Sequence, residues 1–126
     1  MNMEPMNWLA VIVGTIVAFL VGWLWYSPKL FGKGWAEGSG VELGSAGGMP
    51  VVAMVSQLLA LLALALVIGK TATTNDLYTA ILAIVAAGLF VYSNASFSGK
   101  SNYARNVDIF YVLLSGVIMI VCQGIF

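Results

Sequence analysis

Four long runs of apolar residues, separated by shorter polar stretches, follow one another along the chain. Each run is close to the roughly 20 residues that an α-helix needs to cross the hydrocarbon core of a bilayer. Backbone amides inside a bilayer must pair within their own segment, and no run alternates as a strand does, so helices are predicted. We expect these helices at about 7–26, 50–69, 77–97 and 107–126.

Residues near the ends of the runs agree with these limits. Pro28 ends the first helix, and Pro50 suits the first turn of the second. Gly69 is a suitable C-terminal stop for the second helix. We expect Asn106 to cap the fourth helix and Asp108 to lie in its first turn, near the positive end of the helix dipole.

The stretch 27–49 is the longest connection. Its first part, KLFGKGW, mixes aromatic residues with Lys29 and Lys33, so we expect it to lie along the membrane surface. Trp and Tyr favour the interface, which accounts for the aromatic residues around the end of the first helix. The later part is rich in glycine, and we expect it to be flexible.

Composition places the chain among membrane proteins. It is 61% hydrophobic and only 8% charged, whereas soluble domains carry about a quarter charged residues. We therefore predict one all-α domain over residues 1–126, an integral membrane four-helix bundle. Net charge is zero, which argues against a nucleic-acid partner. Without histidine, and with Cys122 as the single cysteine, we expect no metal and no cofactor.

The basic residues predict the orientation. Of the five in the chain, four lie in the first and third connections, namely Lys29, Lys33, Lys100 and Arg105. Lys70 alone lies in the second connection. Since basic connections stay in the cytoplasm, we expect both termini on the non-cytoplasmic side of the cell (inner) membrane. The four basic residues are then candidates for contact with lipid headgroups.

The first helix carries a stripe of small residues at four-residue spacing: Ala10, Gly14, Ala18 and Gly22. Residues four apart share one helical face, and small ones allow another backbone to approach closely. We expect this stripe to pack against a neighbour, which is either another helix of the chain or a second copy.

Polar residues gather near the predicted cytoplasmic side. One interpretation is structural: Asn94 and the nearby serines bond to backbone or to neighbouring helices, while Asp108 caps its helix and pairs with Arg105. The other is a small polar pocket that holds a lipid headgroup or a small metabolite. Its candidate residues are Trp25, Tyr26, Ser27, Asn94 and Asp108, with Gln57 as a possible addition.

The first helix and its continuation resemble a known family. The residues that carry the resemblance are Asn7, Trp8, Gly22, Leu24, Trp25, Tyr26, Ser27, Pro28, Leu30, Phe31, Gly32 and Trp35, with Asp108, Tyr111, Gly116, Ile118 and Met119 in the last helix. Together they make the chain similar to the domain of unknown function 1761 family of small four-helix membrane proteins. The resemblance implies that fold over nearly the whole chain, but no activity and no established site.

Three functions remain open. The first is a non-enzymatic structural or accessory component that binds membrane lipids and either self-associates or joins a larger membrane complex. The alternative is a small oligomeric transporter or channel with a polar path near Asn94 and Asp108. An enzyme acting on lipid comes last, because no Ser–His or Cys–His pair is possible and Asp108 would be its only base.

Overall fold

The computed structural model describes residues 5–41 and 51–126, and all regular structure within them is helical. Five helices follow in order: α1 Trp8–Trp25, α2 Gly32–Ser39, α3 Val51–Ala72, α4 Leu77–Phe97 and α5 Asn102–Ile125. Helices α1, α3, α4 and α5 are each long and apolar enough to cross a membrane. The protein therefore has the composition and the helix lengths of a membrane protein.

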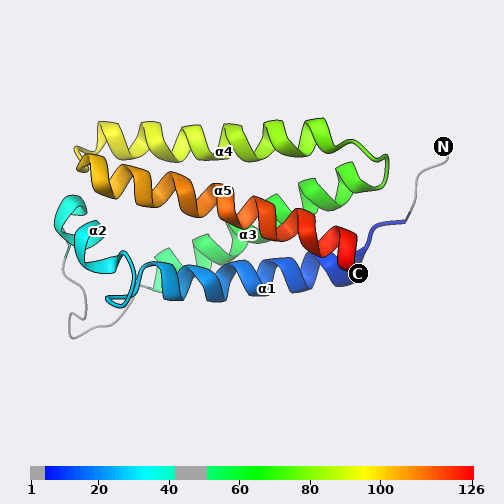
Figure 1. Cartoon of the computed structure of the whole chain (residues 1–126), viewed down its shortest axis with the longest axis horizontal. Coiled ribbons are helices and arrows are strands. Elements are labelled where there is room, and N and C mark those ends of the chain that lie inside the picture. The colour runs from blue at the N-terminus through cyan, green and yellow to red at the C-terminus, as the bar shows by residue number, and fades with distance from the viewer. Residues whose placement is uncertain (1–4, 42–50) are drawn as a thin grey trace.

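Helix α5 is the centre of the packing, since it contacts each of the other four helices. Helices α4 and α5 run side by side, α1 lies along the opposite flank of α5, and α3 crosses behind them (Figure 1). The start of α1 and the end of α5 lie at one end of the molecule and α2 lies at the other (Figure 1). The α1–α2 connection, with Tyr26 and Ser27, and the α4–α5 connection, with Lys100, lie at the α2 end.

The small-residue stripe of α1 packs within the chain. Ala18 has no exposed surface, and Gly14 and Gly22 are also buried. A Cβ on Gly14 would lie 3.4 Å from Cγ of Met119, and a Cβ on Gly22 would overlap the Tyr111 hydroxyl. The neighbour of the stripe is thus α5 of the same chain, so the stripe is not available to a second copy.

The remaining core is apolar and lies between the long helices. Its buried members are Val11, Ala18, Leu61, Ala65, Ile68, Ala80, Ile84 and Met119. Many large apolar side chains face outward instead, including Leu59 on α3 and Phe90 on α4. Such outward faces are costly in water and suit a lipid environment.

Two predicted helix limits are wrong. Helix α5 begins at Asn102, because Ser101 accepts a hydrogen bond from the Ala104 amide and caps it one turn earlier than expected. Helix α3 continues past Gly69 to Ala72. Gly69 is instead a site of close packing, where a Cβ would lie 2.9 Å from Val11. The predicted role of Pro50 lies outside the described residues.

The connection after α1 is more ordered than predicted. Its glycine-rich part begins inside α2, where Gly38 accepts a hydrogen bond from the Ser101 amide at 2.9 Å. Gly40 ends the helix in the left-handed conformation, with φ +73°. The expectation of flexibility for 42–49 lies outside the described residues.

Candidate functional site

A tight reversal after α1 turns the chain back onto the helices. Ser27 donates its hydroxyl hydrogen to the Leu24 carbonyl at 2.7 Å and accepts the Gly32 amide on its own carbonyl at 2.9 Å. A Cβ on Gly32 would overlap the Tyr26 carbonyl oxygen, so only glycine fits here. The reversal allows α2 to begin at once and to lie against α5.

Asp108 on α5 is the centre of the site. It is only 6% exposed, yet three donors satisfy its carboxylate. Oδ1 accepts hydrogen bonds from the Tyr26 hydroxyl at 2.6 Å and from the Trp35 indole at 2.9 Å. Oδ2 forms a salt bridge of 2.9 Å with Nζ of Lys100. The one carboxylate therefore joins the end of α1, helix α2 and the α4–α5 connection.

Tyr26 immediately follows α1 and is held in its neutral form. Burial is the main cause that raises the pKa of its hydroxyl, followed by the negative charge of Asp108 and the hydrogen bond to it. The Tyr26 proton thus stays on the oxygen at neutral pH and remains available to Asp108. In this geometry Tyr26 acts as a hydrogen-bond donor to a buried charge.

Aromatic rings surround the carboxylate. The ring of Tyr26 lies edge-on to Trp35, with centroids 5.0 Å apart, and edge-on to Tyr111 at 5.5 Å. Trp25 packs on Phe31 at 4.5 Å. Such tilted pairs are favourable beyond the area they bury. Tyr26 and Trp35 thus bring both their rings and their donors to Asp108, which is only 6% exposed.

Two hydrogen bonds from aromatic side chains to backbone carbonyls also join α1 and α5. The Trp25 indole donates to the Val107 carbonyl at 3.0 Å. The Tyr111 hydroxyl donates to the Ala18 carbonyl at 2.6 Å. These two bonds hold the part of α5 around Val107 and Tyr111 in register with α1.

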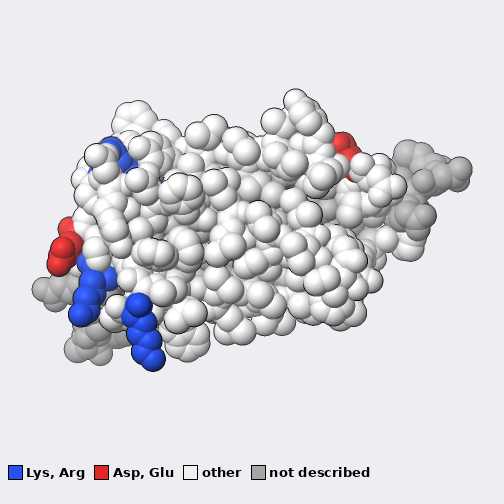
Figure 2. Space-filling model, viewed as in Figure 1, with Lys and Arg blue, Asp and Glu red and all other residues white. Residues whose placement is uncertain are grey.

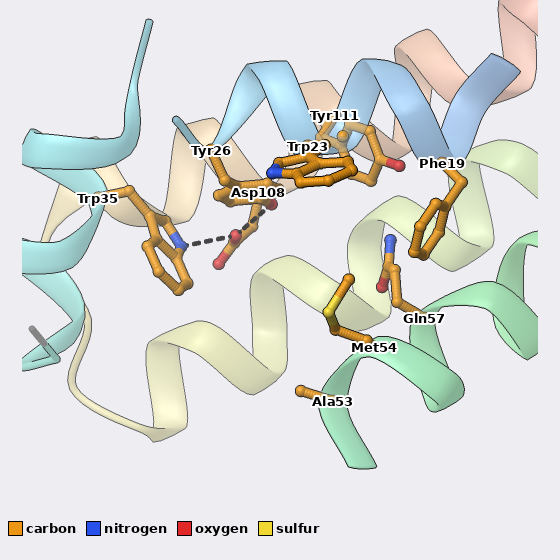
Figure 3. A pocket seen from close by; sticks show the side chains of 10 residues that line it. Phe19, Trp23, Tyr26, Trp35, Ala53, Met54, Gln57, Asp108 and Tyr111 are labelled. Carbon is orange, nitrogen blue, oxygen red and sulfur yellow. Dashed lines mark hydrogen bonds between the residues drawn. The ribbon is translucent and has the colours of Figure 1, made fainter. Parts of the chain in front are cut away.

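A pocket of about 290 Å³ opens beside this cluster, between α1, α3 and α5. Tyr26, Asp108 and Trp35 form one side of it, and Gln57 and Met54 of α3 face them (Figure 3). The aromatic part of the lining also includes Phe19, Trp23 and Tyr111 (Figure 3). Among the described residues, those that line the pocket are Phe19, Gly22, Trp23, Tyr26, Trp35, Ala53, Met54, Gln57, Asp108 and Tyr111.

The pocket does not resemble a metal centre. Among the described residues, no group of three or more His, Cys, Asp or Glu side chains could hold a metal ion. Among the described residues of the lining Asp108 alone is formally charged, and its charge is balanced by Lys100 from outside that set.

A family model described as "Protein of unknown function (DUF1761)" matches residues 9–124 of the chain. The chain belongs to the DUF1761 family. The resemblance seen in the sequence is thereby confirmed. Comparisons with curated proteins and with solved structures find no match. For this DUF1761 protein the site itself must therefore supply the functional inference.

The structure brings together some of the predicted site residues of the DUF1761 protein and separates others. Tyr26 and Asp108 line the pocket, while Trp25 and Ser27 support it from the adjoining turn. Asn94 is exposed and does not line the pocket, so its predicted place there is wrong. The buried face of α4 runs through Gly88 and Ala95, and Asn94 points away from that face.

The basic residues divide into two groups. Lys29 and Lys33 are exposed, as a headgroup contact requires. Lys100 instead turns inward to Asp108 and lies over the Trp35 ring, 5.1 Å from its centroid. Arg105 lies over another ring, that of Tyr92, at 5.5 Å. The predicted pair between Arg105 and Asp108 is therefore wrong, and Lys100 takes its place.

The sequence-based pocket did not include four of its aromatic residues: Phe19, Trp23, Trp35 and Tyr111. One of them carries a usable signal, because Tyr111 follows Asp108 by three residues and so shares its helical face. The contribution of Trp35 depends on how tightly the chain reverses at Gly32, which no local pattern reveals.

Proposed function

We propose that this protein is a non-enzymatic component of the cell (inner) membrane that binds a lipid in the pocket beside Asp108. One observation carries the proposal: among the described residues of the lining Asp108 alone is charged, and Tyr26, Trp35 and Lys100 all bind its carboxylate. A carboxylate that binds donors from three separate elements holds the walls of the pocket in place. The adjoining pocket is left as the part of the site that can receive a ligand.

The position of the pocket supports access from the bilayer. Trp23 on α1 is 63% exposed, and Ala53 and Gln57 on α3 are also exposed. These three residues form the outer edge of the pocket, on the surfaces of helices that are apolar enough to lie in lipid. A lipid can therefore enter sideways, without crossing the protein.

The charge distribution supports a cytoplasmic location for the pocket. On the face shown in Figure 2, the basic side chains gather at the α2 end of the molecule. Lys29, Lys33, Lys100 and Arg105 all lie in or beside connections at that end, whereas Lys70 lies near the end of α3. By the positive-inside rule, the α2 end faces the cytoplasm and both termini lie outside.

Orientation is tested with single cysteines in a Cys122→Ala background, probed in intact cells with a membrane-impermeant thiol reagent. Lys33→Cys lies at the α2 end and should stay unlabelled until the cells are opened. Thr74→Cys lies in the exposed connection between α3 and α4 and should be labelled from outside. Labelling of Lys33→Cys in intact cells would reverse the assignment.

Transport receives little support from the geometry. Asn94 is exposed on α4 and does not line the pocket with Asp108, so the two share no path inside one chain. Beyond Tyr111 the interior continues with apolar residues such as Ile84 and Met119. A polar path through one chain would need hydrogen-bonding side chains along that core.

As the second half of the proposed function, the protein forms a homo-oligomer or joins a larger membrane complex. Its support is the wide apolar surface of α3 and α4, which offers area to membrane neighbours as well as to lipid. The small-residue stripe of α1 does not contribute, because α5 covers it. Native mass spectrometry of the protein taken from membranes reports the stoichiometry, and a single chain with no partner would contradict this half.

Lipid retention tests the pocket directly. In Ala53→Phe a ring is added at the edge of the pocket, while Ala60→Phe adds the same ring to an exposed site of α3 outside the lining. Native mass spectrometry from a non-ionic detergent should find bound lipid on the wild type and on Ala60→Phe, and less on Ala53→Phe. Equal retention by all three proteins would overturn the proposal.

A further inference from the structure

The pocket combines several aromatic faces with one carboxylate and no lining cation. Phe19, Trp23, Tyr26, Trp35 and Tyr111 contribute rings, and Asp108 contributes the only formal charge. The negative faces of aromatic rings attract cations, and cages of such rings are a recurring means of holding ammonium groups. The wall chemistry therefore favours a positively charged ligand group over an anionic one.

The free hydrogen-bonding capacity on the inner side points the same way. The hydroxyls of Tyr26 and Tyr111 and the indole of Trp35 already donate to protein acceptors. These side chains can therefore offer a ligand only ring faces and the remaining lone pairs of the hydroxyl oxygens. The other donors of the lining belong to Trp23 and Gln57, at the exposed outer edge. An inner surface of ring faces with few free donors suits a positively charged ligand group.

Lys100 shows that the cluster accommodates a cation. Its ammonium group lies 5.1 Å from the centroid of the Trp35 ring and 2.9 Å from Asp108. Lys100 reaches these groups from the α4–α5 connection and is not part of the pocket lining. The pocket lining contains the same two types of group, aromatic rings and a carboxylate.

We propose that the pocket selects lipids whose headgroup carries an ammonium group, either primary or quaternary. This inference rests on the proposed lipid-binding function and specifies which lipid class is bound. A volume of about 290 Å³ is at the lower limit for small-molecule sites, so it suits a headgroup and not a whole lipid. The acyl chains then remain in the bilayer beyond Trp23, and the exposed Lys29 and Lys33 lie at the same end of the molecule as the phosphate.

The test compares four lipids on the purified full chain in a non-ionic detergent by native mass spectrometry. Phosphatidylcholine and phosphatidylethanolamine carry an ammonium group, phosphatidylglycerol carries only the phosphate, and diacylglycerol carries neither. We expect both ammonium lipids to bind about tenfold more tightly than phosphatidylglycerol, the size of one desolvated cation–ring contact. Equal affinity for the four lipids would overturn the ammonium selectivity.

Two exposed tryptophans of α1 provide a matched pair of variants. Trp23→Leu removes a ring from the pocket wall but keeps an apolar side chain, and Trp8→Leu makes the same change at the other end of the helix. Trp23→Leu should reduce the preference for ammonium lipids severalfold and leave phosphatidylglycerol binding unchanged. Trp8→Leu should bind as the wild type does. An unchanged preference in Trp23→Leu would count against the aromatic cage.

A competition experiment separates the ammonium group from the lipid that carries it. Tetramethylammonium chloride should displace phosphatidylcholine at concentrations where sodium chloride does not. Equal displacement by the two salts would show screening of surface charge and overturn the selectivity. If Ala53→Phe leaves the binding of every lipid unchanged, the pocket is not the lipid site, and the proposed function fails together with the inference.

Discussion

Replacing Asp108 with asparagine keeps the shape of the side chain and removes the charge on which three elements converge. Two hydrogen bonds to a carboxylate, from Tyr26 and Trp35, become bonds to a neutral amide. Bonds to charged groups contribute about 1.5–3 kcal/mol and neutral ones about 0.5–1.5, so the loss is about 1 kcal/mol for each. The amide nitrogen of the new residue also offers no acceptor to Lys100.

The salt bridge between Lys100 and Asp108 contributes less to the free energy of unfolding than its burial suggests. The Lys100 side chain is 25% exposed and can turn toward water when its partner is lost. We therefore assign the pair about 1 kcal/mol, the value of a partly solvated ion pair. Together the three contacts predict that Asp108→Asn lowers the free energy of unfolding by about 3 kcal/mol.

Unfolding is measured in mixed micelles with a rising fraction of an anionic detergent and followed by tryptophan fluorescence. Trp25 and Trp35 lie in the site, so the signal reports its loss directly. Glu37→Gln is the control, since Glu37 is an exposed acid of α2 and its neutralisation should change stability by less than about 0.5 kcal/mol. If Asp108→Asn unfolds within about 0.5 kcal/mol of the wild type, the carboxylate does not hold these elements together.

Two further predictions concern residues around the same carboxylate. Gly22→Ala should destabilise the fold by about 1–3 kcal/mol, because the added methyl overlaps the Tyr111 hydroxyl. Gly124→Ala is the control, since its methyl meets no atom within 4 Å. Equal unfolding curves for the two variants would contradict the close contact. The raised pKa of Tyr26 makes its contribution to stability complete below about pH 10, the ordinary value for tyrosine, and progressively lost as the pH rises above it. Tyr26→Phe should lack this alkaline loss when unfolding is followed against pH, and an identical alkaline loss in the variant would assign it to another group.

Much of the architecture follows from local sequence. The four spans are recognisable because hydropathy over some 20 residues depends only on neighbours along the chain. Structure then changes the limits where a single contact decides them: Ser101 extends α5 by capping it early, and Gly69 packs against Val11 where a helix end was expected. A local pattern indicates that a glycine or a cap is present, but not which neighbour makes it necessary.

The site was less predictable than the spans. Tyr26 and Asp108 were both recognisable as unusual residues near one side of the membrane, but their direct bond joins positions 82 residues apart. Asn94 looked equally suitable by composition, and the rotation of α4 turns it outward. Polarity and depth can be inferred from sequence, whereas the direction of a side chain around a helix axis depends on which neighbour the helix meets.

The sequence by itself determined the membrane class, the number of apolar spans and the concentration of basic residues in two connections, because each of these is a sum over residues close together in the chain. The tertiary structure decided that the small-residue stripe of α1 faces its own α5, that Lys100 and not Arg105 pairs with Asp108, and that a pocket remains beside them. These outcomes depend on the relative rotation and the distance of packed helices, which are properties of the assembled molecule and are not encoded in any single segment.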